Sequence, residues 1–247
     1  MKFSANLGFL WTDRSLPDAI HAAKAAGFDA VECHWPYEVP AHEVRAALTE
    51  TGLPMLGLNT RRGKPGENGL AALPGREVEA RAAIDEAIAY ADAVDAGAVH
   101  VMAGFADGAA AHATFCDNLR YATAQTPRTI LIEPLNRHDS PSYFLSTTDQ
   151  ACEIIQNVGA ANLKLMFDCY HVGRTEGDVT TRLAALLPMV GHIQFASVPD
   201  RGAPDHGEID FAYVFDAIRA LGWQKPLGAE YKPAGDTDRS LSWMTTF

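Results

Sequence analysis

The most constraining feature of the sequence is an eightfold alternation of short apolar runs with longer Ala-rich stretches. Several runs are almost continuously apolar, which is typical of parallel strands buried on both faces. The pattern predicts eight strands, at residues 2–9, 28–35, 53–59, 98–104, 129–136, 163–171, 191–198 and 227–233. Successive parallel strands require crossover connections, which are right-handed in nearly all proteins. An α/β protein with a parallel sheet is therefore expected.

The stretches between these runs have the boundary signals of helices. Ser15 is the expected N-cap of the first helix, Pro17 lies in its first turn and Gly27 at its end. Ser146, followed by Asp149, predicts the capped start of another helix. Helices are predicted at residues 16–27, 39–52, 75–97, 115–125, 146–159, 179–191 and 210–222.

Eight such units favour a closed barrel over an open sheet. The chain has 247 residues, the typical length of a complete (β/α)8 barrel. The turn after the first run, LGFLWTDRS, contains no GxGxxG phosphate loop, which disfavours a dinucleotide-binding sheet. No Ser/Gly-rich linker divides the chain. We predict a single (β/α)8 TIM barrel over residues 1–247, with the polar loop 60–74 above its catalytic face.

The excess of acidic over basic residues disfavours some classes of binding partner. Lys and Arg number 20 against 31 Asp and Glu, and the resulting charge of −11 opposes nucleic acid or an anionic membrane surface as partner. The spacing of the four cysteines predicts reduced, mostly buried thiols. A signal-peptide pattern and a run of roughly 20 apolar residues are both absent, so a cytoplasmic location is expected. Oligomeric state is left open, with a homo-oligomer among the alternatives.

Polar side chains stand at the ends of the last four predicted strands, where TIM barrels carry their active sites. They are Glu133 on the fifth strand, Asp168 and His171 on the sixth, Gln194 on the seventh and Glu230 on the eighth. Three carboxylates close together in an apolar setting need a cation to remain ionised. The four oxygen donors Glu133, Asp168, Gln194 and Glu230 predict one divalent metal ion, Mg²⁺ or Mn²⁺.

Five segments make the sequence similar to a known family: VHVMAG (99–104), LIEPLNRHDSPSYFLS (131–146), FDCYHVGRTEGDV (167–179), GHIQFASVPDRGAPDHGEIDF (191–211) and EYKP (230–233). They resemble the hydroxypyruvate isomerase family of xylose isomerase-like barrels. The resemblance implies interconversion of hydroxypyruvate and tartronate semialdehyde through an enediolate. It also implies the same four metal ligands, and an acid/base pair formed by Glu133 and Glu230. NTRRGKPGENG and FASVPDRG depart from the family pattern, which leaves substrate identity less constrained than reaction type.

The expected substrate is a small anionic hydroxy-carbonyl compound, which needs polar and cationic contacts. His171 is expected to hydrogen-bond a substrate oxygen. The candidate partners of the substrate carboxylate are Arg61, Arg201 and Lys232, and the candidate wall residues are Asn59 and His100. Arg62 and Lys64 are more typical of solvated surface charges.

Three alternatives are kept. The nearest is another isomerase or epimerase on the same barrel, acting on 2-oxo-tetronate or on a ketose. A metallonuclease resembling the apurinic endonucleases is more distant, because Asn59 and Gln194 leave its multi-zinc cluster incomplete and the chain is acidic. A non-catalytic metabolite binder is disfavoured because a binder has no need for two acid/base glutamates.

Overall fold

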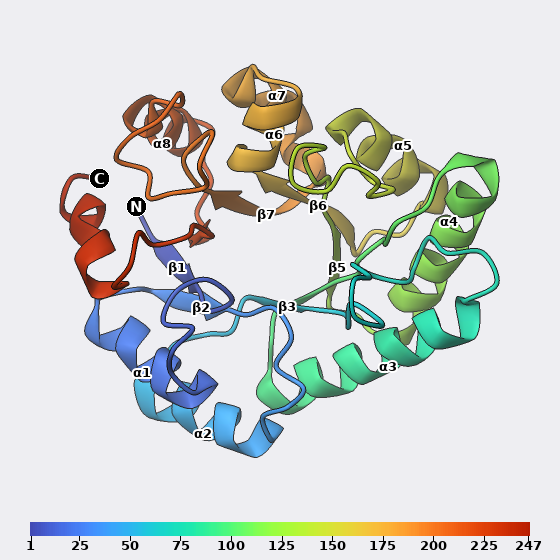
Figure 1. The fold of residues 1–247 in the computed structure, drawn as a ribbon, viewed down its shortest axis with the longest axis horizontal. Helices are drawn as coiled ribbons and strands as arrows, with labels where there is room; N and C mark the ends of the chain where they lie inside the picture. Colours follow the sequence, from blue (N-terminus) through green and yellow to red (C-terminus); the bar gives the residue numbers. More distant parts are fainter.

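The computed structural model describes residues 1–247, and its centre is a ring of eight parallel strands (Figure 1). Their order is β2-β1-β8-β7-β6-β5-β4-β3. The ring closes between β2 and β3, where the Val31 N–H donates to Pro54 O (3.0 Å) and the Leu56 N–H donates to Val31 O (2.7 Å). The strands are β1 (Phe3–Asn6), β2 (Ala30–Glu32), β3 (Gly57–Asn59), β4 (Ala98–His100), β5 (Thr129–Ile132), β6 (Leu163–Asp168), β7 (Val190–Phe195) and β8 (Leu227–Ala229). The predicted (β/α)8 fold is confirmed.

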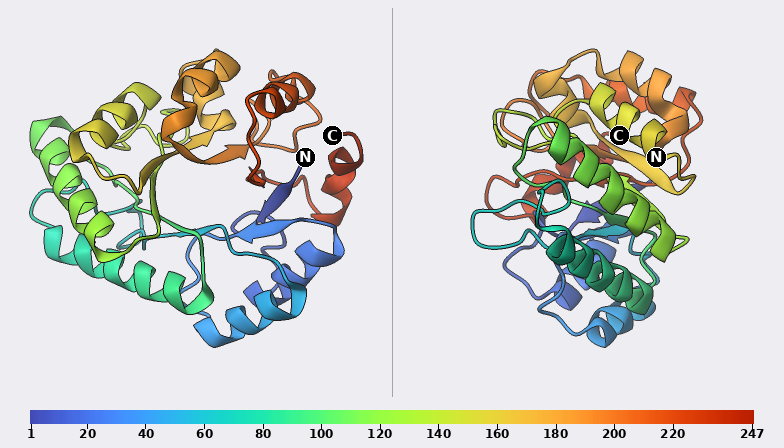
Figure 2. Two further views of the ribbon diagram at one scale, coloured as in Figure 1. Left: turned by 180° about the vertical axis from the view of Figure 1, so that it is seen from behind. Right: turned by 90° about the vertical axis from the view of Figure 1, so that its right-hand side faces the viewer.

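Helices surround the strands on all sides (Figures 1 and 2). They are α1 (Leu16–Ala25), α2 (Ala41–Thr51), α3 (Glu77–Val94), α4 (Gly108–Gln125), α5 (Thr148–Val158), α6 (Cys169–Thr175), α7 (Val179–Leu186) and α8 (Phe211–Ala220), with 3-10 helices η1 (Leu187–Met189) and η2 (Asp238–Thr245). After β8, the 3-10 helix η2 fills the outer position that α-helices fill elsewhere in the ring (Figure 1). None of the helices has the length and apolar character needed to span a bilayer.

Local chemistry sets most helix boundaries near their predicted places. Ser15 caps α1 by accepting a hydrogen bond from the Asp18 N–H, as predicted. The cap of α5 is Thr147, one residue after the predicted Ser146, because the Thr147 hydroxyl accepts from the Gln150 N–H. Gly52 and Gly159 end α2 and α5 in the left-handed conformation that glycine adopts at low cost.

Several predicted boundaries are wrong by three residues or more, and two of them have a clear local cause. Helix α4 begins at Gly108 rather than at residue 115, because Ala109–Ala111 extend the helix despite offering little periodic signal. The strand predicted at 163–171 ends at Asp168, whose carboxylate caps a new helix by accepting from the Tyr170 N–H at 2.8 Å. His171 therefore lies on α6 rather than on β6.

Apolar side chains form one large core between the strands and the helices. Trp243 of η2 lies edge-on against Phe3 and Phe195, with ring centroids 4.9 and 5.4 Å away, and so fixes the C-terminal segment to β1 and β7. A separate apolar group inside the barrel consists of Ala98, Leu131 and Met166. The four cysteines are free thiols and buried, as predicted.

Candidate active site

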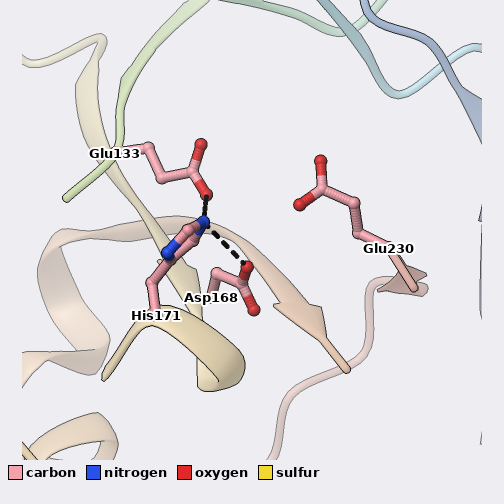
Figure 3. A group of neighbouring side chains, drawn as sticks. All are labelled: Glu133, Asp168, His171 and Glu230. Carbon is pink, nitrogen blue, oxygen red and sulfur yellow. Dashed lines mark ion pairs between the residues drawn. The ribbon is translucent and has the colours of Figure 1, made fainter. Parts of the chain in front are cut away.

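Three buried carboxylates meet at the C-terminal mouth of the barrel (Figure 3). Glu133 follows β5, Asp168 ends β6 and Glu230 follows β8. One oxygen from each of them and one nitrogen of His171 lie within 4.8 Å of one another. The structure thus gathers three of the four predicted ligands at one point, where parallel strands end at the same rim.

The carboxylates have opposite electrostatic environments. Burial, and then the charges of Glu230 and Asp168, raise the pKa of Glu133 well above its usual range. Burial, followed by the charge of Glu230, raises the pKa of Asp168 to about 7. Burial also raises the pKa of Glu230, but Arg201 and a hydrogen bond from His34 outweigh it and hold that pKa at about 2. The cluster contains three carboxyl groups and one guanidinium, that of Arg201, so its electrostatics favour an additional cation.

His171 is held in a single neutral tautomer. Its Nδ1 accepts hydrogen bonds from the backbone N–H of Asn136 (2.9 Å) and from Asn136 Nδ2 (2.8 Å). Burial, and then Arg201, lower the pKa of His171 to about 3, so the proton of the neutral ring lies on Nε2. Nε2 is 3.8 Å from Glu133 Oε1 and 3.7 Å from Asp168 Oδ2. This nitrogen is a donor facing the cluster rather than a metal ligand.

Gln194, the fourth predicted ligand, lies on β7 between the other strands of the site. Its Cα is paired in register with Asp168 on β6 and with Gly228 on β8. Its Nε2 donates to Glu32 Oε1 at 2.9 Å, while its Oε1 is buried without a hydrogen-bond partner.

Three of the four predicted ligands have unpartnered oxygens that fit a hard divalent cation. Glu133 Oε1, Asp168 Oδ2 and Gln194 Oε1 are all buried and lack hydrogen-bond partners. Buried polar atoms are nearly always paired, so three unpartnered acceptors at one strand-end rim form a set that could hold a cation. Oxygen donors of this kind suit Mg²⁺ or Mn²⁺.

Comparison with known proteins places the chain in a family. The model of the xylose isomerase-like TIM barrel family matches residues 20–247. A 2-oxo-tetronate isomerase from Cupriavidus necator is 42% identical, with 100% of this chain and 98% of the relative aligned. The hydroxypyruvate isomerase of Escherichia coli is 35% identical over 100% of this chain and 99% of its own. The chain belongs to the hydroxypyruvate isomerase family of xylose isomerase-like TIM barrels. The resemblance predicted from sequence is confirmed, and the chain is an isomerase-type enzyme acting on a small hydroxy-oxo acid.

A solved relative of this hydroxypyruvate isomerase-like enzyme has nearly the same fold. It is a Brucella melitensis protein titled AP endonuclease, family 2, with a TM-score of 0.95 and 34% sequence identity. The alignment covers 100% of this chain and 98% of that one.

A cavity of about 480 Å³ opens above the carboxylates of the isomerase. Glu133, Glu230 and His171 line this cavity. It is also lined by the predicted substrate contacts Asn59, His100, Arg201 and Lys232, and by Arg62. Arg201 pairs with Glu230 and lies 3.8 Å from Asp168 Oδ2, with its guanidinium over the Phe9 ring. Both ring nitrogens of His100 are buried and unpartnered, and burial lowers its pKa to about 3.

The structure corrects the placement of one predicted contact. Arg61 does not line the cavity, because its guanidinium is bound on the outer surface by Glu86 (2.7 Å) and Glu38 (3.2 Å). The neighbouring Arg62, predicted as a surface charge, lines the cavity instead. It stacks over the Trp35 ring at 4.7 Å and donates to Asn68 Oδ1 at 3.1 Å.

Sequence reasoning missed three polar residues that contact Glu230 or Gln194: Asn6, His34 and Glu32. Glu230 Oε1 accepts hydrogen bonds from Asn6 Nδ2 (2.9 Å) and His34 Nε2 (3.0 Å), and Glu32 accepts from Gln194. Asn6 and Glu32 are the last residues of β1 and β2. The strand-end rule used for the second half of the chain would have found both of them in the first half.

Proposed function

We propose that the enzyme is a metal-dependent aldose-ketose type isomerase whose principal reaction converts hydroxypyruvate to tartronate semialdehyde. The observation that carries this proposal is the pair of buried glutamates, Glu133 and Glu230, on separate strands beside three unpartnered oxygens. A protein that only bound the acid would not require two carboxylates at the cavity floor.

The ligands of the ion in this proposal are Glu133, Asp168, Gln194 and Glu230, and the ion is Mg²⁺ or Mn²⁺. When bound, such an ion supplies Lewis-acid polarisation of the substrate carbonyl and its neighbouring hydroxyl. Mg²⁺ and Mn²⁺ are preferred over zinc because all four donors are oxygens, whereas zinc more often takes His or Cys.

Proton transfer is assigned to the two glutamates. One removes the proton from the hydroxyl-bearing carbon and the other returns a proton to the adjacent carbon of the enediolate, while the hydroxyl proton moves to the former carbonyl oxygen. The roles are exchanged in the reverse direction. The two glutamates directly follow β5 and β8, and their carboxyls approach the cavity from different sides (Figure 3). A planar intermediate between them can therefore be reached by both.

Two further residues bind the substrate in this scheme. His171 Nε2–H donates to a substrate oxygen, since its other ring nitrogen is occupied by Asn136. Arg201 is the first candidate partner of the substrate carboxylate because its guanidinium is buried at the cavity floor, and Arg62 and Lys232 add positive charge at the wall.

A four-carbon acid, 2-oxo-tetronate, is the second candidate substrate. The cavity of about 480 Å³ has room for an additional hydroxymethyl group. The relative from Cupriavidus necator, at 42% identity, carries the name 2-oxo-tetronate isomerase. Cleavage of a nucleic-acid backbone is disfavoured by the net charge of −11, although the Brucella structure carries an endonuclease title.

The decisive experiment is turnover in D₂O with hydroxypyruvate and 2-oxo-tetronate as alternative substrates. Product deuterated at the carbon that receives the proton is expected, because carboxyl protons exchange with solvent. Chelation should abolish turnover and Mn²⁺ should restore it. E133Q and E230Q should lose about 10²–10⁴-fold in kcat with an unchanged circular dichroism spectrum. E38Q, which alters an exposed glutamate, is the matched control.

Two results would contradict the proposal. Turnover without deuterium incorporation would exclude proton transfer by the glutamates. Failure to convert either acid, combined with cleavage of abasic DNA, would favour the nuclease alternative.

A further inference from the structure

A second buried polar cluster lies inside the barrel, next to the candidate metal site. It is centred on Glu32 of β2, which is only 4% exposed. Its Oε2 is 2.5 Å from His192 Nε2, and its Oε1 accepts from Gln194 Nε2 (2.9 Å) and Asn6 Nδ2 (3.1 Å). The proton-transfer scheme above assigns this carboxylate no role.

Gly228 on β8 leaves the space that the Glu32 carboxylate occupies. A Cβ on Gly228 would lie 2.6 Å from Glu32 Oε1, 2.8 Å from Gln194 Cγ and 2.9 Å from His192 Nε2. Burying a carboxylate destabilises the fold unless it is paired and hydrogen-bonded. The partners of Glu32 therefore indicate which neighbouring side chains it holds in place.

The contacts of Glu32 fix the orientation of two amides. An ionised carboxylate only accepts hydrogen bonds, so Gln194 must turn its Nε2 toward Glu32 and keep Oε1 for another partner. Asn6 is fixed in the same way: its Nδ2 faces both Glu32 and Glu230 (2.9 Å), while its Oδ1 accepts from the Gly8 N–H. Glu32 thus contacts Gln194 directly and reaches Glu230 through Asn6.

We propose that Glu32 is a positioning residue for the metal site, which holds the Gln194 amide so that its oxygen, rather than its nitrogen, is presented to the ion. This inference rests on the proposed function, since it requires the ion. At the other carboxylate oxygen, the Ser4 hydroxyl donates a hydrogen bond (3.4 Å) and His192 Nε2 lies 2.5 Å away. Groups that orient ligands in this way typically change metal affinity by about 10–100-fold when they are altered.

The test is a Mn²⁺ titration of the metal-free enzyme by calorimetry, with no substrate present. In E32Q the new amide can donate as well as accept, so the Gln194 amide is no longer held in one orientation. The expected result is a Kd for Mn²⁺ about 10–100-fold higher than in the unaltered enzyme. E176Q is the matched control, because Glu176 is a buried carboxylate that accepts from Thr148 on α5, away from the site, and its Kd should not change.

A double-mutant cycle separates positioning from a general loss of structure. Q194A removes the amide that Glu32 is proposed to orient, so adding E32Q to Q194A should weaken Mn²⁺ binding less than E32Q weakens it alone. Should E32Q fail to fold, E32D retains the acceptor-only charge on a shorter side chain and should show a smaller loss in the same titration.

The possible results are distinguishable. Unchanged Mn²⁺ affinity in E32Q, unchanged affinity in E32D where E32Q does not fold, or fully additive losses in the cycle would overturn the positioning role and leave the proposed reaction standing. Absence of Mn²⁺ binding by the unaltered enzyme would overturn the metal-dependent function and the positioning role together.

Discussion

Replacement of Arg201 by glutamine tests the electrostatic description of the site most directly. The Arg201 guanidinium contacts Glu230, lies 3.8 Å from Asp168 Oδ2 and packs over the rings of Phe9 and Tyr170 at 4.7 and 5.0 Å. The side chains of Arg201 and Glu230 are only 13% and 6% exposed. R201Q therefore leaves a buried carboxylate without its cation.

The magnitude follows from the burial of this pair. Removing one partner of a buried ion pair costs about 3–5 kcal/mol of the free energy of unfolding. In a chain of this size each kcal/mol shifts Tm by about 2–4 °C, so R201Q should unfold roughly 6–20 °C below the parent in the absence of metal. The exposed pair Arg219–Asp216 provides the control, since R219Q should cost at most about 1 kcal/mol.

The assay is thermal unfolding in EDTA and again with excess Mn²⁺. A metal ion supplies the positive charge that R201Q lacks, and at 100-fold excess over its Kd it stabilises the folded state by about 2.7 kcal/mol. Part of the lost Tm should therefore return on addition of Mn²⁺. A Tm for R201Q in EDTA equal to that of the parent would refute the view that Arg201 neutralises the carboxylates.

Three other outcomes follow from the structure. R62A should raise KM for the acid several-fold in steady-state kinetics, whereas R61A should leave kcat/KM unchanged, and equal effects would contradict their opposite placements. W243A should lower the free energy of unfolding by about 3–5 kcal/mol in a urea titration, because this side chain is 1% exposed; a loss below about 1 kcal/mol would show that η2 is dispensable. The His206 ring donates hydrogen bonds to Asp200 and Asp205, which raise its pKa, so they stabilise the fold at low pH and cease to do so as pH rises through that pKa. In D200N an NMR titration should find the pKa of His206 lowered.

The positions of the acidic residues were predictable because strand ends are visible in the sequence. Glu133 and Glu230 each come directly after an apolar run, and Asp168 is the last residue of one. In a parallel barrel all such ends share one rim, so their proximity follows from topology without any knowledge of side-chain packing. His171 lies in the same cluster but on α6 rather than at the end of a strand, because the backbone turns into a helix immediately after Asp168.

The placement of Arg61 and Arg62 was not predictable from local pattern. The two residues are adjacent in an irregular loop, where no periodicity assigns a side chain to one face. Their positions depend on partners remote in sequence: Glu86 lies on α3, whereas Trp35 follows β2. Such contacts exist only after the barrel has closed.

The two halves of the barrel contribute differently to the site. The proposed acid/base pair and the proposed ligands come from β5 to β8 and the residues directly after them. Much of the cavity wall comes from the end of β3 and from segments after β2 and β3, including His34, Asn59 and Arg62. Mutations in the first half can alter the size and charge of the acid that is accepted while the proton-transfer residues stay in place. Proteins that share this scaffold can thereby differ in substrate while they keep the same type of reaction.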